Sequence, residues 1–122
     1  YVKNYDKIAD PSAYTQSLKD FKNTIEGGTS LITYFGHSSA TNLDFNLNNP
    51  DAYNNQYKYP LFIVNGCDAG NMFTYESQRL SLKTTISEKF VLAPQRGAIG
   101  YLSTTNYGAV NYLDTFTTKF YR

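Results

Sequence analysis

The chain has 122 residues, of which 41% are hydrophobic and 17% charged, and its formal net charge is +1. A chain of this length buries roughly two thirds of its unfolded surface, which suffices for one hydrophobic core. The near-neutral charge, with no cluster of Lys or Arg, argues against nucleic acid as a partner. No apolar stretch approaches the roughly 20 residues that a membrane-spanning helix needs.

The composition therefore predicts a single globular domain over residues 1–122. The chain opens at Tyr1 without an initiator methionine or a signal-peptide pattern, so we expect further residues before it. The one cysteine cannot form an internal disulfide, and its thiol is expected to be free.

The first predicted element is a helix that begins after Asp10. Asp10 is a favourable N-cap, Pro11 suits the first helical position, and Gly27-Gly28 favours an end. Between them, apolar residues recur at i, i+4, i+7 and i+11, which is the spacing of one helix face. These residues are Tyr14, Leu18, Phe21 and Ile25.

Two strands and a long connection follow this helix. Ser30 to Phe35 is rich in β-branched and aromatic residues and predicts a strand. Gly36 to Lys58 is rich in Asn and lacks periodicity, so we expect a loop with one helical turn after Pro50. Leu61 to Val64 is a continuous apolar run after Tyr59-Pro60 and predicts a strand buried on both faces.

The last third of the chain predicts two helices around a strand. Ile86, Phe90 and Val91 fit a helix from Thr84 to Ala93 that stops before Pro94. The run from Gly97 to Leu102 predicts a third, glycine-containing strand, and Ala109 to Phe120 predicts a final helix.

This order of elements, α-β-loop-β-α-β-α, predicts an α/β fold with a parallel sheet, right-handed crossovers and helices on both faces. Three strands make a small sheet with two unpaired edges. We therefore expect that strands belong on the N-terminal side of this chain, or that it pairs with another chain. The order of the strands in the sheet cannot be derived from one sequence.

The only histidine and the only cysteine of the chain each follow a predicted strand. His37 lies in Gly36-His37-Ser38-Ser39 and Cys67 in Asn65-Gly66-Cys67-Asp68. The carboxyl ends of neighbouring parallel strands meet at one edge of a sheet, so we expect these two residues at the same edge. An imidazole beside a partly exposed thiol makes a nucleophile and its base.

Two glycines favour this chemical interpretation, although a purely structural alternative exists. Gly66 and Gly70 allow tight turns around Cys67 that leave backbone N–H groups pointing at one spot, as an oxyanion hole needs. A lone cysteine after an apolar run is also a common core residue, and a histidine in such a loop is often a turn residue. The matching positions of His37 and Cys67 favour chemistry.

Metal sites have weaker support in the sequence. Asp44, Asp51 and Asp68 lie near Asn residues and have oxygens that suit Ca²⁺, yet they lack the spacing of an EF-hand. We interpret them as solvated loop carboxylates. One His and one Cys are too few for a zinc site, and we predict no cofactor. Glu88 receives no assigned role.

Four segments in order carry a resemblance to a known family. They are Ile32 to Ser39, Leu61 to Gly70, Ser87 to Phe90 and Arg96 to Tyr101. In these segments the chain resembles the gingipain family of cysteine peptidases, and within it the gingipain-like sortase of the type IX secretion system of Bacteroidetes. That family shares with caspases and legumains a His-Gly motif and a Cys motif at the ends of adjacent strands. The resemblance spans about residues 30 to 108 and implies part of a caspase-like catalytic domain.

The resemblance also implies residue roles. The family's histidine maps to His37 as general base and acid, and its cysteine maps to Cys67 as nucleophile, with Gly70 in register. The oxyanion hole would use the N–H groups of Cys67 and of the residue after the histidine. That residue is Ser38 here, where the family usually has glycine, and a loop that demanded φ > 0 would strain it.

The resemblance further implies a substrate class and a location. In this fold the first specificity pocket is usually lined by the chain after the third strand, which here includes Thr104, Thr105, Asn106 and Tyr107. The implied substrates are polypeptides, including C-terminal secretion signals, and the implied location is exported: periplasmic, cell-surface or extracellular. The activity would be peptide hydrolysis or transpeptidation. The alternative is a catalytically silent binding or scaffold module of a secretion or surface machine.

Overall fold

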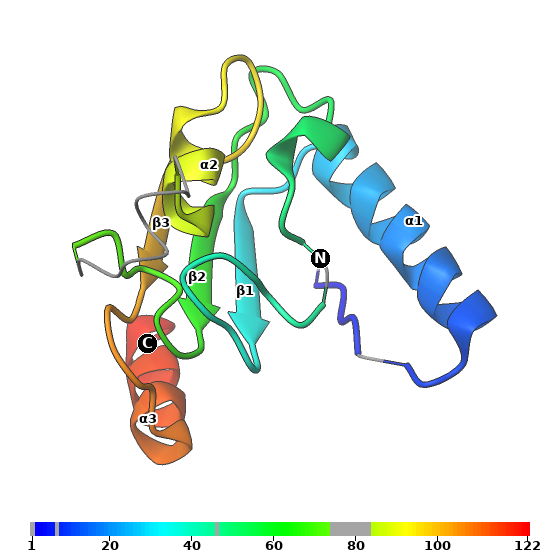
Figure 1. Ribbon diagram of the computed structural model, residues 1–122. Helices are drawn as coiled ribbons and strands as arrows, with labels where there is room; N and C mark the ends of the chain where they lie inside the picture. The colour runs from blue at the N-terminus through cyan, green and yellow to red at the C-terminus, as the bar shows by residue number, and fades with distance from the viewer. Residues whose placement is uncertain (1, 7, 46, 74–83) are drawn as a thin grey trace.

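The computed structural model describes residues 2–6, 8–45, 47–73 and 84–122. Within these ranges, three α-helices and one short 3-10 turn flank three strands (Figure 1). In chain order the elements are α1 (Pro11–Gly27), β1 (Leu31–Phe35), η1 (Pro50–Ala52), β2 (Leu61–Asn65), α2 (Ile86–Leu92), β3 (Gly100–Ser103) and α3 (Val110–Phe120). In this part of the chain no helix is long and apolar enough to cross a bilayer.

The strands form a parallel sheet in the order β1-β2-β3, with β2 in the centre. Leu31 pairs with Leu61, and Phe35 pairs with Asn65 at the other end of the ladder. The arrowheads in Figure 1 therefore point the same way, and the carboxyl ends of the strands share one edge of the sheet. The predicted parallel α/β fold is confirmed. The expectation of further strands beyond β1 stays a prediction.

Helix α1 begins and ends where the sequence predicts. The Asp10 carboxylate accepts a hydrogen bond from the N–H of Ala13 at 2.8 Å. The hydroxyl of Ser12 and this N–H lower the pKa of Asp10 below its usual value. The helix ends before Gly28, whose φ of 102° suits glycine.

The hydrophobic core lies between one face of the sheet and the helices α1 and α2. Alternate residues of β1 face the core, with Ile32 and Tyr34 buried and their neighbours exposed. The ring of Phe62 lies 4.8 Å from that of Phe90 on α2, so aromatic packing joins helix and sheet. On the other face, the hydroxyl of Tyr121 after α3 meets that of Thr33.

The region around α2 and β3 departs from the predicted boundaries. The predicted helix from Thr84 begins at Ile86, because Thr85 is the N-cap and donates its N–H to Glu88 at 2.7 Å. Glu88 therefore has a capping role that the sequence did not suggest. The predicted strand from Gly97 begins only at Gly100, because the Gly97 N–H bonds to the side chain of Asn55 and so leaves the ladder.

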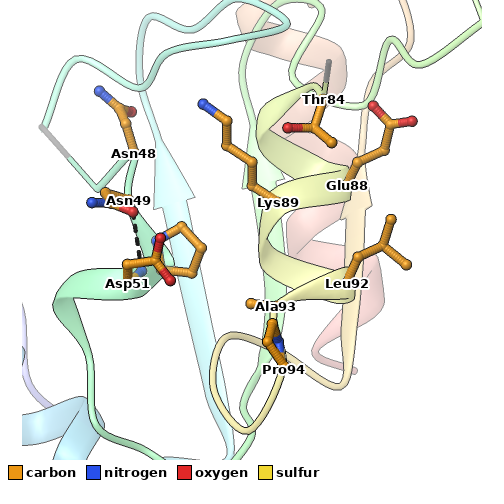
Figure 2. Close-up of a pocket in the computed structure, with 10 residues that line it drawn as sticks. Asn48, Asn49, Asp51, Thr84, Glu88, Lys89, Leu92, Ala93 and Pro94 are labelled. Carbon is orange, nitrogen blue, oxygen red and sulfur yellow. Dashed lines mark hydrogen bonds between the residues drawn. The ribbon is translucent and has the colours of Figure 1, made fainter.

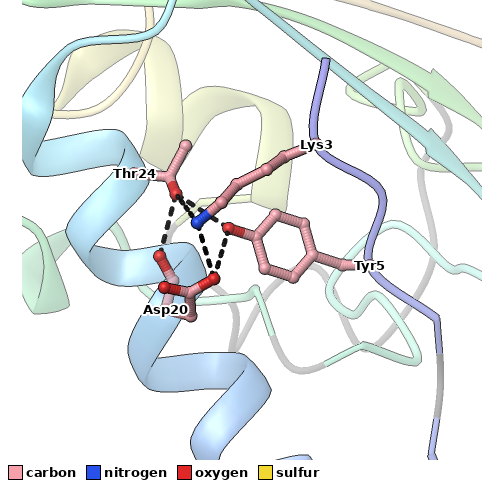
Figure 3. A network of polar contacts seen from close by, with 4 residues as sticks. All are labelled: Lys3, Tyr5, Asp20 and Thr24. Carbon is pink, nitrogen blue, oxygen red and sulfur yellow. Dashed lines mark hydrogen bonds and ion pairs between the residues drawn. The ribbon is translucent and has the colours of Figure 1, made fainter. Parts of the chain in front are cut away.

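A polar network attaches the N-terminal segment to α1 (Figure 3). The Lys3 ammonium donates to the Asp20 carboxylate at 2.6 Å, and the hydroxyls of Tyr5 and Thr24 lie 2.7 Å apart. The carboxylate of Asp20 raises the pKa of Lys3, and the ammonium lowers that of Asp20. Because the pair is exposed, its contribution to stability is small.

Candidate active site

His37 and Cys67 leave neighbouring strands at matching positions. Phe35 and Asn65 are the last residue pair of the β1-β2 ladder. His37 follows Phe35 by two positions, and Cys67 follows Asn65 by two positions. The N–H of Gly36 still bonds to the carbonyl of Asn65 at 3.1 Å, so the two chains remain side by side past the strands. His37 and Cys67 therefore lie on adjacent segments at the carboxyl edge of the sheet.

The His37 loop is anchored through its backbone. The carbonyl of His37 accepts hydrogen bonds from the Tyr34 hydroxyl at 2.6 Å and from the Asp44 N–H at 3.1 Å. The turn is closed by a bridge between Ser38 and Leu43. The imidazole itself is on an exposed residue. The backbone is thus fixed while the side chain stays accessible to a substrate.

Ser38 adopts an ordinary backbone conformation. The described non-glycine residues with positive φ are Tyr57, Asp68 and Gln95, so Ser38 lies outside the left-handed region. The backbone strain that a positive φ would impose on a serine is therefore absent at this position. Its hydroxyl donates to the carbonyl of Cys67 at 2.7 Å, which links the two loops directly.

Cys67 has a free thiol in a half-buried position. The N–H of Gly108 donates to its Sγ at 3.4 Å. Helix α3 begins at Val110, so the sulfur lies close to the N-terminal end of a helix. The thiol also lies 3.9 Å from the carbonyl oxygen of Gly108, to which it can donate.

The predicted specificity segment wraps around the Cys67 loop. The carbonyl of Thr104 accepts from the Gly70 N–H at 2.8 Å, and that of Asn106 accepts from the Asp68 N–H at 3.1 Å. The hydroxyl of Thr104 also bonds to the carbonyl of Gly66. The structure thus brings this segment to Cys67, with Thr105 and Tyr107 exposed beside it. Their role in substrate selection stays a prediction.

Two glycines allow the close approach of these segments. A Cβ added to Gly66 would lie 2.1 Å from the Ser38 Oγ and 2.7 Å from the carbonyl oxygen of Gly36. One added to Gly70 would lie 3.0 Å from the carbonyl oxygen of Ser103. Position 66 therefore requires a residue without a side chain, because another backbone segment occupies the space, whereas position 70 is tight and a side chain there would require its neighbour to shift slightly.

Sequence reasoning missed three residues that hold the site together. Tyr34 anchors His37, Gly108 contacts the Cys67 sulfur, and the Ser103 hydroxyl donates to the carbonyl of Val64 at 2.9 Å. The one visible signal is that hydroxyl side chains are frequent where β1 and β3 end. That pattern alone does not tell which carbonyl each hydroxyl meets.

The aspartates considered for Ca²⁺ do not converge. Among the described residues, no group of three His, Cys, Asp or Glu side chains is placed to hold a metal ion. Asp51 lies 3.5 Å from Arg96, and Asp68 accepts from the side chain of Asn71 at 3.4 Å. The interpretation of these carboxylates as metal ligands therefore gains no support.

Two pockets lie away from His37 and Cys67. One, of about 500 Å³, is lined by residues of the η1 region and of α2, including Asp51, Glu88 and Lys89 (Figure 2). The other, of about 930 Å³, runs along β1 between α1 and the N-terminal segment. Neither of these two pockets is lined by His37 or Cys67.

Comparison with known proteins gives one match. The sequence profile of peptidase family C25 matches residues 1–122, which is the whole chain. No curated protein and no solved structure matches it.

Proposed function

The chain belongs to peptidase family C25, the gingipain family of cysteine peptidases, and from this premise we propose that it cleaves polypeptides through a thioester formed on Cys67. The proposal takes Cys67 as the nucleophile and His37 as general base and acid. Its main structural support is the placement of both residues two positions beyond the last paired residues of β1 and β2.

The proposed reaction proceeds in two halves. His37 accepts the thiol proton, and the Cys67 sulfur attacks the carbonyl carbon of the scissile peptide bond. The imidazolium then gives its proton to the leaving amine as the C–N bond breaks, which leaves a thioester. Water or an amine acceptor, deprotonated by His37, attacks the thioester, and the C–S bond breaks as the Cys67 sulfur takes this proton back from His37. The product is a carboxylic acid after hydrolysis or a new amide after transfer.

We propose that the backbone N–H groups of Ser38 and Cys67 form the oxyanion hole. Over the described ranges, neither N–H has a hydrogen-bond acceptor, although the residues around them are bonded. A backbone donor that is left free beside a nucleophile is available to an anionic oxygen. The ordinary φ of Ser38 supports this role over the catalytically silent alternative, because no strain has to be relieved.

The finer part of the proposal concerns substrates and place of action. By its resemblance to the type IX sortase, the protein would act outside the cytoplasm on exported polypeptides and on their C-terminal signals. Thr104 to Tyr107 would line the first specificity pocket. Hydrolysis and transpeptidation share the thioester, and the acceptor decides between them.

The proposal is tested by the reactivity of the single thiol in the intact protein. We expect Cys67 to react with iodoacetamide faster than free cysteine at pH 6, and His37→Ala to lower that rate. Cleavage of a reporter polypeptide should be lost in Cys67→Ser and should fall by about 10²–10⁴ in His37→Ala. Ser39→Ala, which changes an exposed neighbour in the same loop, serves as the control.

Two results would contradict this function. One is a Cys67 thiol that stays unreactive in the folded protein. The other is a cleavage rate that is unchanged in His37→Ala. Either result would favour the catalytically silent module.

A further inference from the structure

The peptide group between Cys67 and Asp68 is held from two sides. Its carbonyl accepts the hydroxyl of Ser38 at 2.7 Å, and its N–H donates to the carbonyl of Asn106 at 3.1 Å. These partners come from different loops, one after β1 and one after β3. The peptide plane after the proposed nucleophile is therefore held by the loops that follow β1 and β3, the strands on either side of β2.

The conformation of this peptide needs such support. Asp68 has a φ of 55°, in the left-handed region that costs energy for a residue with a side chain. Asp tolerates this region better than most residues, but its neighbours must hold it there. The two hydrogen bonds described above hold the peptide before Asp68, and the N–H of Asn71 donates to the Asp68 carbonyl at 2.9 Å and holds the peptide after it.

Ser38 and Gly66 are complementary in space. A Cβ at position 66 would lie 2.1 Å from the Ser38 Oγ, so the hydroxyl occupies room that only a glycine leaves. From there the Ser38 hydroxyl reaches the Cys67 carbonyl, which a glycine at position 38 could not do. The bond thus depends on a hydroxyl side chain at position 38.

We propose that the Ser38 hydroxyl is a positioning residue for Cys67, an inference that rests on the proposed function. By holding the Cys67 carbonyl, it sets the direction of the Cys67 side chain and its distance from the His37 loop. It also fixes the distance between the Ser38 N–H and the Cys67 N–H. The reason is that Ser38 carries both its own N–H and the hydroxyl that holds Cys67. Misplacement of such groups lowers turnover more than substrate binding.

The test compares three substitutions at position 38 in the intact protein. Ser38→Ala and Ser38→Gly remove the hydroxyl, and we expect kcat to fall by about three- to tenfold with KM nearly unchanged. Ser38→Thr keeps a hydroxyl and should restore kcat to within about twofold of the parent. Ser39→Ala removes a neighbouring exposed hydroxyl and should leave kcat unchanged.

A spectroscopic readout separates positioning from a general loss of stability. Cys67 is the only cysteine, so ¹³C-labelled Cys with ¹⁵N-labelled Asp isolates the single Cys67-Asp68 peptide. Loss of the bond from Ser38 should shift this carbonyl resonance in the Ala and Gly variants but not in Ser38→Thr or Ser39→Ala. An unchanged resonance in Ser38→Ala would refute the inference, as would full kcat in Ser38→Gly or a loss in Ser38→Thr equal to that in Ser38→Ala.

The outcomes distinguish this inference from the proposed function. If the protein showed no turnover at all, the proposed function would fail. The role of Ser38 would still be decided by the carbonyl resonance and by the rate of Cys67 alkylation. If turnover depended on Cys67 and His37 while the Ser38 variants behaved as the parent, only the positioning role would fail.

Discussion

The loops that carry His37 and Cys67 leave adjacent strands at the same register, but they are held in different ways. The carbonyl of His37 is bonded by Tyr34 and Asp44, both within the stretch 34–44. Most of the hydrogen bonds that fix the Cys67 loop come from other segments of the chain. Those partners are Ser38, Thr104, Asn106 and Gly108.

The His37 loop is thus held by residues close to it in the sequence, whereas the Cys67 loop is held by residues from other parts of the sheet. The His37 loop can form once β1 and its turn are in place, because its contacts close short loops. The Cys67 loop reaches its conformation only when β1, β2 and β3 are assembled. The geometry of the proposed nucleophile is therefore coupled to folding of the whole sheet, and that of the proposed base much less so.

Replacing Gly66 should have the largest effect, because it forces the two loops apart. In Gly66→Ala the new Cβ would lie 2.7 Å from the backbone oxygen of Gly36, which cannot rotate away. We expect a loss of about 1–3 kcal/mol in the free energy of unfolding, measured with urea, and slower alkylation of Cys67.

A matched glycine serves as the control for this substitution. A Cβ on Gly27 at the end of α1 would meet nothing within 4 Å, so Gly27→Ala should cause no loss. Equal stability of Gly66→Ala and Gly27→Ala would contradict the tight junction between the loops.

Removing the Thr104 hydroxyl should disturb the Cys67 loop more than the His37 loop, which the Ser38 hydroxyl joins to it. Thr104→Val keeps the shape of the side chain but leaves the carbonyl of buried Gly66 without this donor. We expect a loss of about 1–2 kcal/mol on urea unfolding and slower Cys67 alkylation. Thr105→Val, on the exposed neighbour, should stay within about 0.5 kcal/mol of the parent. A shift of the single His37 imidazole resonance in Thr104→Val as large as that of the Cys67-Asp68 carbonyl resonance would contradict the difference in anchoring.

Removing the Tyr34 hydroxyl should disturb the His37 loop more than the Cys67 loop, and it should cost less stability than Thr104→Val. In Tyr34→Phe the carbonyl of His37 keeps its bond from the Asp44 N–H, so we expect a loss of about 1 kcal/mol. The His37 imidazole resonance should shift more than the Cys67-Asp68 carbonyl resonance, which is bonded to the His37 loop only through Ser38. Equal movement of both resonances would show that the two loops are anchored as one unit.

Tyr101→Phe is the matched control for Tyr34→Phe. The hydroxyl of Tyr101 is buried and has no hydrogen-bond partner among the described residues. Its removal should therefore leave stability equal or higher by up to about 1 kcal/mol. A loss as large as that in Tyr34→Phe would mean that the effect comes from packing and not from the hydrogen bond.

Tyr101→Phe should also change how the stability of the protein depends on pH. Burial raises the pKa of Tyr101 above its ordinary value of 10.0. The folded protein then keeps this proton at a pH where the unfolded chain loses it, so the contribution of Tyr101 to stability is constant below pH 10 and falls as the pH rises further. Tyr101→Phe should reduce that fall, and an identical decline in parent and variant would contradict it.

The elements predicted best from the sequence are those whose signals are local. The N-cap Asp10 and the apolar stripe that includes Phe21 and Ile25 predicted α1, and the apolar run from Leu61 predicted β2. The strand from Gly97 was predicted too long, because the bond between the Gly97 N–H and the Asn55 side chain joins distant residues. Such a bond leaves no trace in the spacing of residues.

The sequence by itself determined the α/β class, the family and the pairing of a lone histidine with a lone cysteine behind two strands. These follow from periodicity, capping and motif order, which are read along the chain. Only the tertiary structure decided that β2 is central, that Ser38 is unstrained and that its hydroxyl reaches Cys67. The physical reason is that these features depend on contacts across the sheet, between residues that the sequence keeps far apart.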